Sequence, residues 1–252
     1  MSDVGKWPSA EFGTAPRTAA VFGSTGGIGA ALCNELARRG CERIYTGSRL
    51  GEAQQGAGFT PFAFDLTDED SLAAAAALMR EDPPQWVIVA SGVLTLADGT
   101  GPERTYKRLS AKSMAEVFAI NTIGPALIAK HVLPLMPRPA PFVFAALSAR
   151  VGSISDNGLG GWHSYRASKA ALNMLIKNFA LEMGRTHQLS VVVGLHPGTV
   201  DSALSEPFQK GLADGQLTAP AKAAENLVGV LADLEPKDSG KVFDFAGIEV
   251  PA

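Results

Sequence analysis

A tyrosine and a lysine stand four residues apart in the segment SYRASKA, residues 164–170. The segment opens a helical pattern, and positions i and i+4 of a helix lie on one face. The hydroxyl of Tyr165 and the ammonium of Lys169 can therefore approach a common point. A phenol with a pKa near 10 needs roughly 3 units, or about 4 kcal/mol, of preferential phenolate stabilisation to titrate near neutrality. An ammonium in a desolvated cleft contributes to this, so the pair predicts proton transfer, although the spacing alone is also typical of a half-buried tyrosine beside a solvated lysine.

Apolar runs of strand length alternate with helical patterns along the chain. The runs TAAVFG, WVIVA and LSVVVGLH are continuously apolar, which is typical of parallel strands that helices cover on both faces. The sequence therefore predicts an α/β, three-layer Rossmann fold with a doubly wound parallel sheet of about seven strands and about six helices. We expect a polar leader over residues 1–16, a single domain over residues 17–252, and a substrate-loop lid over residues 201–220.

The composition restricts the classes of partner. The 252 residues are 46% hydrophobic and carry a formal net charge of −3, so there is no basic excess to bind nucleic acids or anionic membranes. Cys33 and Cys41 have no metal-ligand spacing with the four histidines, which predicts reduced thiols and no metal site. The longest apolar run, LAAAAALM, is far short of a bilayer span. We therefore expect a cytoplasmic protein that binds small molecules and copies of itself.

The turn from the first predicted strand into the first predicted helix is rich in glycine. In VFGSTGGIGAALCNEL, the glycines Gly23, Gly27 and Gly29 permit a tight turn and close backbone approach. A helix N-terminus at this place offers free amides and a positive dipole end to a pyrophosphate. The pattern favours a dinucleotide site over a turn that is rich in glycine for packing alone.

The end of the second predicted strand, YTGSRL, carries an arginine in place of an acidic residue. A guanidinium suits a ribose 2′-phosphate, so Arg49 favours NADP(H) over NAD(H), the alternative being an ordinary solvated arginine. Asp65, after the third predicted strand, is a candidate for binding an adenine amino group. It is equally a candidate helix cap, a role that Thr67 or Asp68 can also fill.

Five motifs in order resemble the short-chain dehydrogenase/reductase family over residues 17–250: GSTGGIG, DLT, NTIG, YRASK and HPGTVDS. The segments SARVGSISDN and GKVFDFAGIEVP are similar to the branch that contains the C-factor cell-signalling proteins. The resemblance implies an NAD(P)-dependent oxidoreductase that transfers a hydride between a nicotinamide and a carbonyl or alcohol substrate.

The resemblance also implies roles for individual residues. Tyr165 is the general acid in carbonyl reduction or the base in alcohol oxidation, Lys169 binds the nicotinamide ribose, and Asn121 holds a water that links the lysine to solvent. His196 has no implied chemical role, and we interpret it as structural. The implied cofactor-binding set is Gly23, Ser24, Gly27, Ile28, Gly29, Arg49, Asp65, Leu66, Ala90, Ser91, Gly92, Tyr165, Lys169, Pro197, Gly198, Val200 and Ser202.

The substrate-orienting serine departs from the family pattern. Many relatives end the fifth strand with SSxxG, whereas this chain has LSARVG, so an ungapped match places Ala149 in the serine position. We assign the role to Ser148, which reaches the tyrosine only if the strand ends or bulges before it. Ser153 and the absence of any such serine are the alternatives.

Apolar residues surround the expected substrate entrance, which favours a carbonyl compound of modest polarity. We expect Leu94, Leu96, Trp162 and His163 to line this entrance, and Leu204 and Phe208 to belong to the lid. The helices around Asn121 and Tyr165 are apolar over much of their circumference, which predicts a homodimer or homotetramer. The alternative function is a nucleotide-binding signalling or regulatory protein with little or no turnover.

Overall fold

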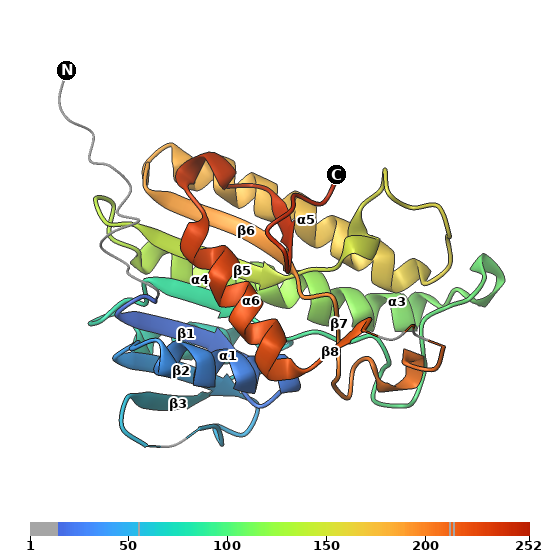
Figure 1. Cartoon of the computed structure of the whole chain (residues 1–252), viewed down its shortest axis with the longest axis horizontal. Helices are drawn as coiled ribbons and strands as arrows, with labels where there is room; N and C mark the ends of the chain where they lie inside the picture. Colours follow the sequence, from blue (N-terminus) through green and yellow to red (C-terminus); the bar gives the residue numbers. More distant parts are fainter. Residues whose placement is uncertain (1–14, 55, 212, 214) are drawn as a thin grey trace.

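The structure is a computed structural model that describes residues 15–54, 56–211, 213 and 215–252 (Figure 1). Residues 1–14 of the expected leader lie outside the described residues. The first strand begins at Thr18, close to the boundary that the sequence indicates.

Within the described residues, seven parallel strands form one sheet in the order β3-β2-β1-β4-β5-β6-β9. Their bounds are β1 Thr18–Phe22, β2 Arg43–Ser48, β3 Phe59–Ala63, β4 Trp86–Val89, β5 Phe142–Leu147, β6 Ser190–His196 and β9 Val242–Asp244. All residues of β1, β4 and β5 are buried, because helices cover both faces of the sheet. The predicted parallel, helix-covered sheet is confirmed.

The helices cover the two faces of the sheet in two groups (Figure 1). Leucines of α1 (Gly27–Arg38) and α6 (Pro220–Asp233) pack in the core of one face. The other face is covered by α2 (Glu69–Leu78), α4 (Gly124–Val132) and α5 (His163–Gly184). The remaining α-helix of the described residues, α3 (Ala111–Phe118), contacts α5.

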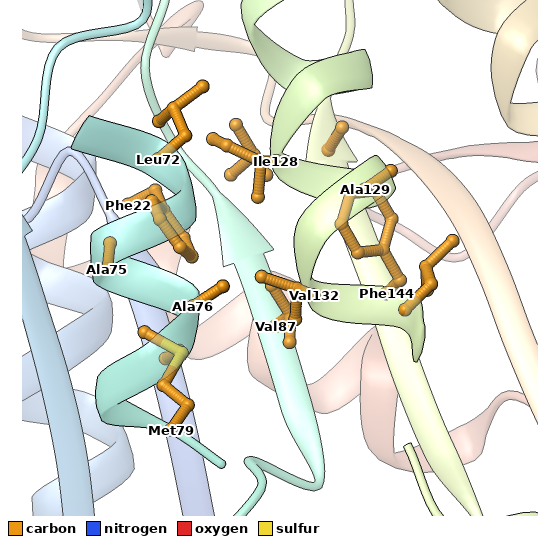
Figure 2. Packing of buried hydrophobic residues seen from close by; sticks show 14 of the residues in the cluster. Phe22, Leu72, Ala75, Ala76, Met79, Val87, Ile128, Ala129, Val132 and Phe144 are labelled. Atoms are coloured by element: carbon orange, nitrogen blue, oxygen red, sulfur yellow. The ribbon is translucent and has the colours of Figure 1, made fainter. Parts of the chain in front are cut away.

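The core between the sheet and the second group of helices is built from large apolar side chains, of which Figure 2 shows a part. Leu72 from α2 and Ile128 from α4 meet Phe22 of β1 there. The ring of Phe22 also makes edge-on contacts with Phe62 and Phe64, at centroid distances of 5.1 and 5.2 Å. These contacts fix the end of β1, and the glycine-rich turn follows directly.

The strand order reverses between β1 and β4, which lie side by side in the sheet. Connections from these two strands leave in opposite directions, and a crevice forms above their carboxyl ends. Gly23 follows β1 and Ala90 follows β4, so both lie at the crevice.

A continuous helical segment crosses from α3 to α4 through a π-helical turn at Ala119–Ile123 and ends in the 3₁₀ turn η3 (Leu133–Leu135). By length and composition alone, the segment Ala111–Leu135 is apolar enough to cross a bilayer, and half of its most apolar window is buried in the protein. A core helix of a soluble protein passes the same test. The π-helical turn contains Asn121, and such turns are frequent at functional sites.

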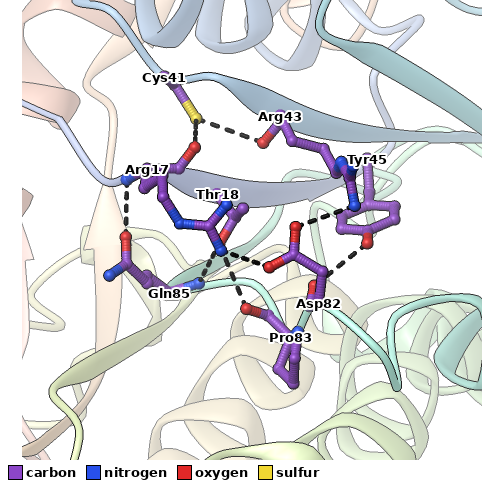
Figure 3. Close-up of polar contacts among 8 residues, drawn as sticks. All are labelled: Arg17, Thr18, Cys41, Arg43, Tyr45, Asp82, Pro83 and Gln85. Atoms are coloured by element: carbon purple, nitrogen blue, oxygen red, sulfur yellow. Dashed lines mark hydrogen bonds and ion pairs between the residues drawn. The ribbon is translucent and has the colours of Figure 1, made fainter.

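At the other end of the sheet, polar contacts hold together the amino ends of β1, β2 and β4 (Figure 3). Asp82, from the segment before β4, pairs with Arg17 and with Arg43 at 2.9 Å, and its carbonyl accepts a hydrogen bond from Tyr45 at 3.1 Å. Cys41 donates to backbone carbonyls in the same region. Burial raises the pKa of Cys33 to about 12 and that of Cys41 to about 11, so neither thiol is a ready nucleophile at neutral pH.

Two glycines in helices allow a matched test of the turn. A Cβ at Gly29 would lie 2.0 Å from the carbonyl oxygen of Gly23, whereas one at Gly229 in α6 would meet no atom within 4 Å. We expect Gly29→Ala to lower the free energy of unfolding by about 1 to 3 kcal/mol, because backbone must shift. Gly229→Ala should raise it by about 0.5 to 1 kcal/mol through helix propensity. Urea unfolding measures both changes. An unchanged free energy of unfolding for Gly29→Ala would contradict this account of the turn.

Candidate active site

The glycine-rich turn is fastened to β2 by its own backbone. Gly23, at φ +96°, and Ser24 both donate their amide N–H to the carbonyl of Gly47, at 3.0 and 2.8 Å. The buried Ser24 hydroxyl donates to the same carbonyl at 2.9 Å. Ser24 therefore uses both its side chain and its backbone N–H to hold the turn to β2.

The turn combines close packing with a free helix terminus. A Cβ at Gly23 would lie 2.5 Å from Ser91 Oγ, and one at Gly29 would lie 2.0 Å from Gly23 O. Packing is therefore already a sufficient reason for glycine at both positions. Gly27 is exposed and begins α1, whose N-cap residue Gly26 provides no side-chain cap in the described structure. Uncapped amides at the positive end of a helix dipole are the donors that a pyrophosphate accepts. The packing interpretation and the nucleotide-binding interpretation of this turn are therefore compatible.

Arg49 and Asp65 lie beyond β2 and β3 as neighbouring exposed groups. Asp65 Oδ1 accepts hydrogen bonds from the hydroxyl and amide of Thr67, and these bonds, aided by the charge of Arg49, hold the pKa of Asp65 below its usual value. The N-cap of α2 is Asp68, whose carboxylate accepts from Asp70 N and Ser71 N. Asp65 is thus not needed as the cap of that helix.

A cleft of about 280 Å³ continues from the crevice over the carboxyl ends of β4, β5 and β6. The predicted residues that line it are Ile28, Ala90, Ser91, Gly92, Ser148, Tyr165, Lys169, Pro197, Gly198, Val200 and Ser202. The other predicted residues do not line the cleft: Gly23, Ser24, Gly27 and Gly29 of the turn, and Arg49, Asp65, Leu66 and Asn121. The structure therefore places the implied chemical groups in a cleft next to the glycine turn.

Tyr165 and Lys169 face the same cleft from the first two turns of α5. The Lys169 Nζ lies 5.8 Å from the centre of the Tyr165 ring and donates to the carbonyl of Leu147 at 2.7 Å. Burial lowers the pKa of Lys169 to about 8 and raises that of Tyr165 to about 12. The phenol is therefore protonated at neutral pH.

Asn121 lies directly behind this pair. Its amide group makes two hydrogen bonds of 2.8 Å to Val93, one to the backbone N–H and one to the carbonyl, and donates to Ser168 Oγ at 3.3 Å. A Cβ at Gly92 would lie 3.3 Å from Asn121 Oδ1 and 3.6 Å from Lys169 Nζ. Asn121 thus joins the segment after β4 to α5, and its implied role in holding a water stays a prediction.

The serine candidates have different surroundings. β5 ends at Leu147, so Ser148 lies just past the strand and lines the cleft, but its hydroxyl donates to Asn173 Oδ1 at 2.6 Å. Ala149 lines the cleft beside it. Ser153 is buried, bonds to Asp156 N and Ala252 O, and does not belong to the cleft lining. Of the two serines, only Ser148 is at the cleft, and it is already engaged in a hydrogen bond.

The outer part of the cleft is aromatic. The ring of Trp162 makes edge-on contacts with Phe208 at 5.1 Å and with Tyr165 at 6.3 Å between centroids. Phe208 belongs to the expected lid, which the two-stranded sheet of β7 (Thr199–Val200) and β8 (Leu217–Thr218) anchors. Leu94 lines the cleft as expected, and so does Leu204 of the expected lid. Leu96 lines a small cavity beside Tyr165, and His163 is outside the lining of both.

His196 lines the cleft at the end of β6, and its Nδ1 is buried without a hydrogen-bond partner among the described residues. Burial lowers its pKa to about 4, although the nearby Asp244 carboxylate opposes this, so the imidazole is neutral at neutral pH. In the described part of the chain, no group of three or more His, Cys, Asp or Glu side chains is arranged to hold a metal ion.

Sequence reasoning missed several lining residues. Val151 and Ser205 reach the cleft from turns, and Thr199 from the short strand β7, and the paths of these segments depend on tertiary contacts. It also missed Glu103, whose carboxylate contacts the first turn of α5 from a distant loop. Nothing in the local sequence around Glu103 marks it, because its partner lies 61 residues away.

The chain matches the short chain dehydrogenase family over residues 17–213. It is 32% identical to 1-hydroxy-2-glutathionyl-2-methyl-3-butene dehydrogenase of Rhodococcus sp. (strain AD45), over 89% of this chain and 94% of that protein. It is 35% identical to C-signal of Myxococcus xanthus over 55% of this chain and 78% of that protein. The NADPH-bound carbonyl reductase from chicken fatty liver superposes with a TM-score of 0.81 at 25% identity, over 94% of this chain and 100% of that one. The chain therefore belongs to the short-chain dehydrogenase/reductase family and is an oxidoreductase that acts on CH–OH or C=O groups.

Proposed function

We propose that this protein is an NADP(H)-dependent reductase of carbonyl compounds, with Tyr165 as the proton donor. The observation that carries the proposal is the position of Tyr165 and Lys169 in one cleft that continues from the glycine turn. A proton donor is required only by an enzyme, since a protein that merely senses a nucleotide needs no such group.

The residues present fit the cofactor. The uncapped N-terminus of α1 suits a pyrophosphate, and the exposed guanidinium of Arg49 suits a 2′-phosphate. Lys169 and the segment Pro197–Val200 line the cleft, where they would bind the nicotinamide ribose and the nicotinamide, respectively. The bound cofactor supplies the hydride. NADPH in the chicken carbonyl reductase and NADP in a similar Burkholderia multivorans protein support the choice of NADP(H).

The protonation states favour the direction of reduction. With its pKa raised to about 12, Tyr165 holds its proton at neutral pH and can donate it to a carbonyl oxygen as hydride adds to the carbonyl carbon. The charge of Lys169 stabilises the phenolate that remains until solvent returns a proton. The products are an alcohol and the oxidised cofactor. Because the Ser148 hydroxyl is bonded to Asn173, polarisation of the carbonyl falls mainly to Tyr165.

The cleft and the surface support further parts of the proposal. Apolar walls, including Leu94, Trp162 and Phe208, suit a carbonyl compound of modest polarity. On α5, Met174 and Leu181 are 62% and 55% exposed and lie seven residues apart on one face. We infer that this face, together with the half-exposed Ile123 on the neighbouring helical segment, forms a homodimer contact.

A second candidate is a nucleotide-binding regulatory protein with little turnover. The similarity to C-signal and the alanine at position 149 favour it. The presence of Asn121, Tyr165 and Lys169 together favours the enzyme, so we place the regulatory function second.

Removing the phenolic hydroxyl tests the mechanism. We expect Tyr165→Phe to reduce turnover of aldehydes, ketones or quinones with NADPH by at least about 100-fold, because general acid catalysis contributes that much. Tyr106→Phe is the matched control, since Tyr106 is 67% exposed on the turn η1 (Tyr106–Arg108) and outside the cleft. The measurement is steady-state oxidation of NADPH. Equal rates for Tyr165→Phe and the unmodified protein would exclude Tyr165 as the acid.

Arg49→Ala tests the choice of cofactor. Loss of charge-assisted hydrogen bonds to a 2′-phosphate should raise the Kd for NADPH about tenfold or more. The Kd for NADH should stay within about twofold of its original value, because NADH lacks that phosphate. Titration followed by cofactor fluorescence measures both constants. An equal rise in the Kd of Arg49→Ala for NADPH and for NADH would contradict a 2′-phosphate contact. If the unmodified protein bound neither cofactor, both candidate functions would be excluded.

Lys169→Met tests how much the buried ammonium costs in stability. Lys169 has a folded pKa of about 8, below the 10.5 of an unfolded lysine, so between these values the unfolded chain binds more protons and stability rises with pH. Below pH 8 the burial penalty is fully present. After loss of the bond to Leu147 O, Lys169→Met should still gain about 1 to 2 kcal/mol at pH 7, a gain that shrinks towards pH 10.

Denaturant unfolding at several pH values provides this measurement. Lys177→Met, which alters an exposed lysine further along α5, should change stability little at any pH. A Lys169→Met variant that is less stable than the original protein at pH 7 would mean that the buried ammonium is fully compensated.

A further inference from the structure

The helix that carries Tyr165 begins without a cap of its own. The N-cap residue of α5 is Trp162, at φ +50°, and its side chain makes no capping hydrogen bond. A tryptophan rarely adopts this left-handed conformation, which strains a bulky residue. The first amides of α5 therefore depend on groups from elsewhere in the chain.

Glu103 supplies those groups from the loop between β4 and η1. Its carboxylate accepts hydrogen bonds from Ser164 twice, from the backbone N–H at 3.0 Å and from the hydroxyl. Its backbone carbonyl accepts from Trp162 N at 2.5 Å. Glu103 is only 8% exposed, so these bonds are made in a largely water-free environment. A single residue thus caps the helix and holds its strained N-cap residue.

The ionised form of Glu103 suits this place. Burial raises the pKa of its carboxyl, but the hydrogen bonds from the Ser164 hydroxyl and amide outweigh burial, and the pKa lies below its usual value, with a smaller contribution from His163. A carboxylate at a helix N-terminus also meets the positive end of the helix dipole.

Glu103 and Tyr165 are neighbours as well as links in one chain of contacts. Tyr165 directly follows Ser164, the residue that Glu103 binds. Glu103, Ser164 and Tyr165 also line one small cavity of about 10 Å³, which has room for one water at most. A change in the Glu103 contacts is therefore transmitted to Tyr165 without any intermediate element.

We propose that Glu103 is a positioning residue: through Ser164 and Trp162 it fixes the first turn of α5 so that the Tyr165 hydroxyl and the Trp162 ring face the cleft. This inference rests on the proposed function of Tyr165. It goes further in assigning a role in turnover to a loop residue that lies outside the cleft lining. A cap that served stability alone would leave turnover unchanged well below the melting temperature.

The test compares Glu103→Ala with Glu103→Gln in the full chain. Glu103→Ala should lower kcat at least tenfold while the KM for NADPH changes less than twofold, because the pyrophosphate turn is untouched. Glu103→Gln should recover kcat to within about threefold, since its amide oxygen still accepts from Ser164 N. Glu116→Gln, at a half-exposed position on α3 whose side chain pairs with Lys112, is the control and should keep full activity. In a Tyr165→Phe background, Glu103→Ala should cause no further loss, because it acts through that tyrosine.

A spectroscopic readout separates failure of this inference from failure of the proposed function. Glu103→Ala should lose the near-ultraviolet circular dichroism that Trp162→Phe also removes, with the far-ultraviolet spectrum retained. If no carbonyl substrate is turned over, an unchanged near-ultraviolet spectrum overturns the inference and a lost one supports the positioning of Trp162 and Tyr165. If turnover exists, an unchanged kcat in Glu103→Ala overturns it. Should Glu103→Ala fail to fold, Ser164→Ala removes only the hydrogen bond from the Ser164 hydroxyl to Glu103. This variant must then show a decrease in kcat that is smaller than the tenfold expected for Glu103→Ala, and an unchanged kcat overturns the inference.

Discussion

The candidate site is built around one buried ammonium. Lys169 is 3% exposed and donates to the carbonyl of Leu147, which joins α5 to the end of the central strand β5. Burying a charge costs free energy unless it is paired or hydrogen-bonded, and one carbonyl compensates only in part. Such a charge is retained where it serves chemistry, and here it lies beside the ring of Tyr165. The site thus holds a destabilising group at the point where it is most useful.

Close backbone approaches bring the rest of the chain to this pair. Gly152 lies so near α5 that a Cβ there would be 2.8 Å from the Cβ of Lys169. Gly92 passes over Asn121 and Lys169, and Gly23 passes against Ser91. In each case a missing side chain lets two segments meet that are distant in sequence. The cleft is therefore shaped by glycines at its back and by Trp162 and Phe208 at its entrance.

The two halves of the site differ in how they are held. The glycine turn is fixed by backbone hydrogen bonds to Gly47 and by the aromatic cluster beneath β1. The half with Tyr165 depends on side chains from three separate segments, through Asn121, Glu103 and Phe208. Backbone contacts tolerate substitution of neighbouring side chains, whereas the second half changes with each of them.

The sequence by itself determined the layered fold, the glycine turn, and the pairing of Tyr165 with Lys169. These follow from local signals: the apolar periodicity, the glycine spacing and the i to i+4 relation on one helix. The tertiary structure decided which serine reaches the cleft, which residue caps α2, and how α5 begins. Ser148 bonds to Asn173, Asp68 rather than Asp65 caps α2, and Glu103 binds Ser164 across 61 residues. Each of these depends on the direction of a side chain at the end of an element, and only the packing of distant segments fixes that direction.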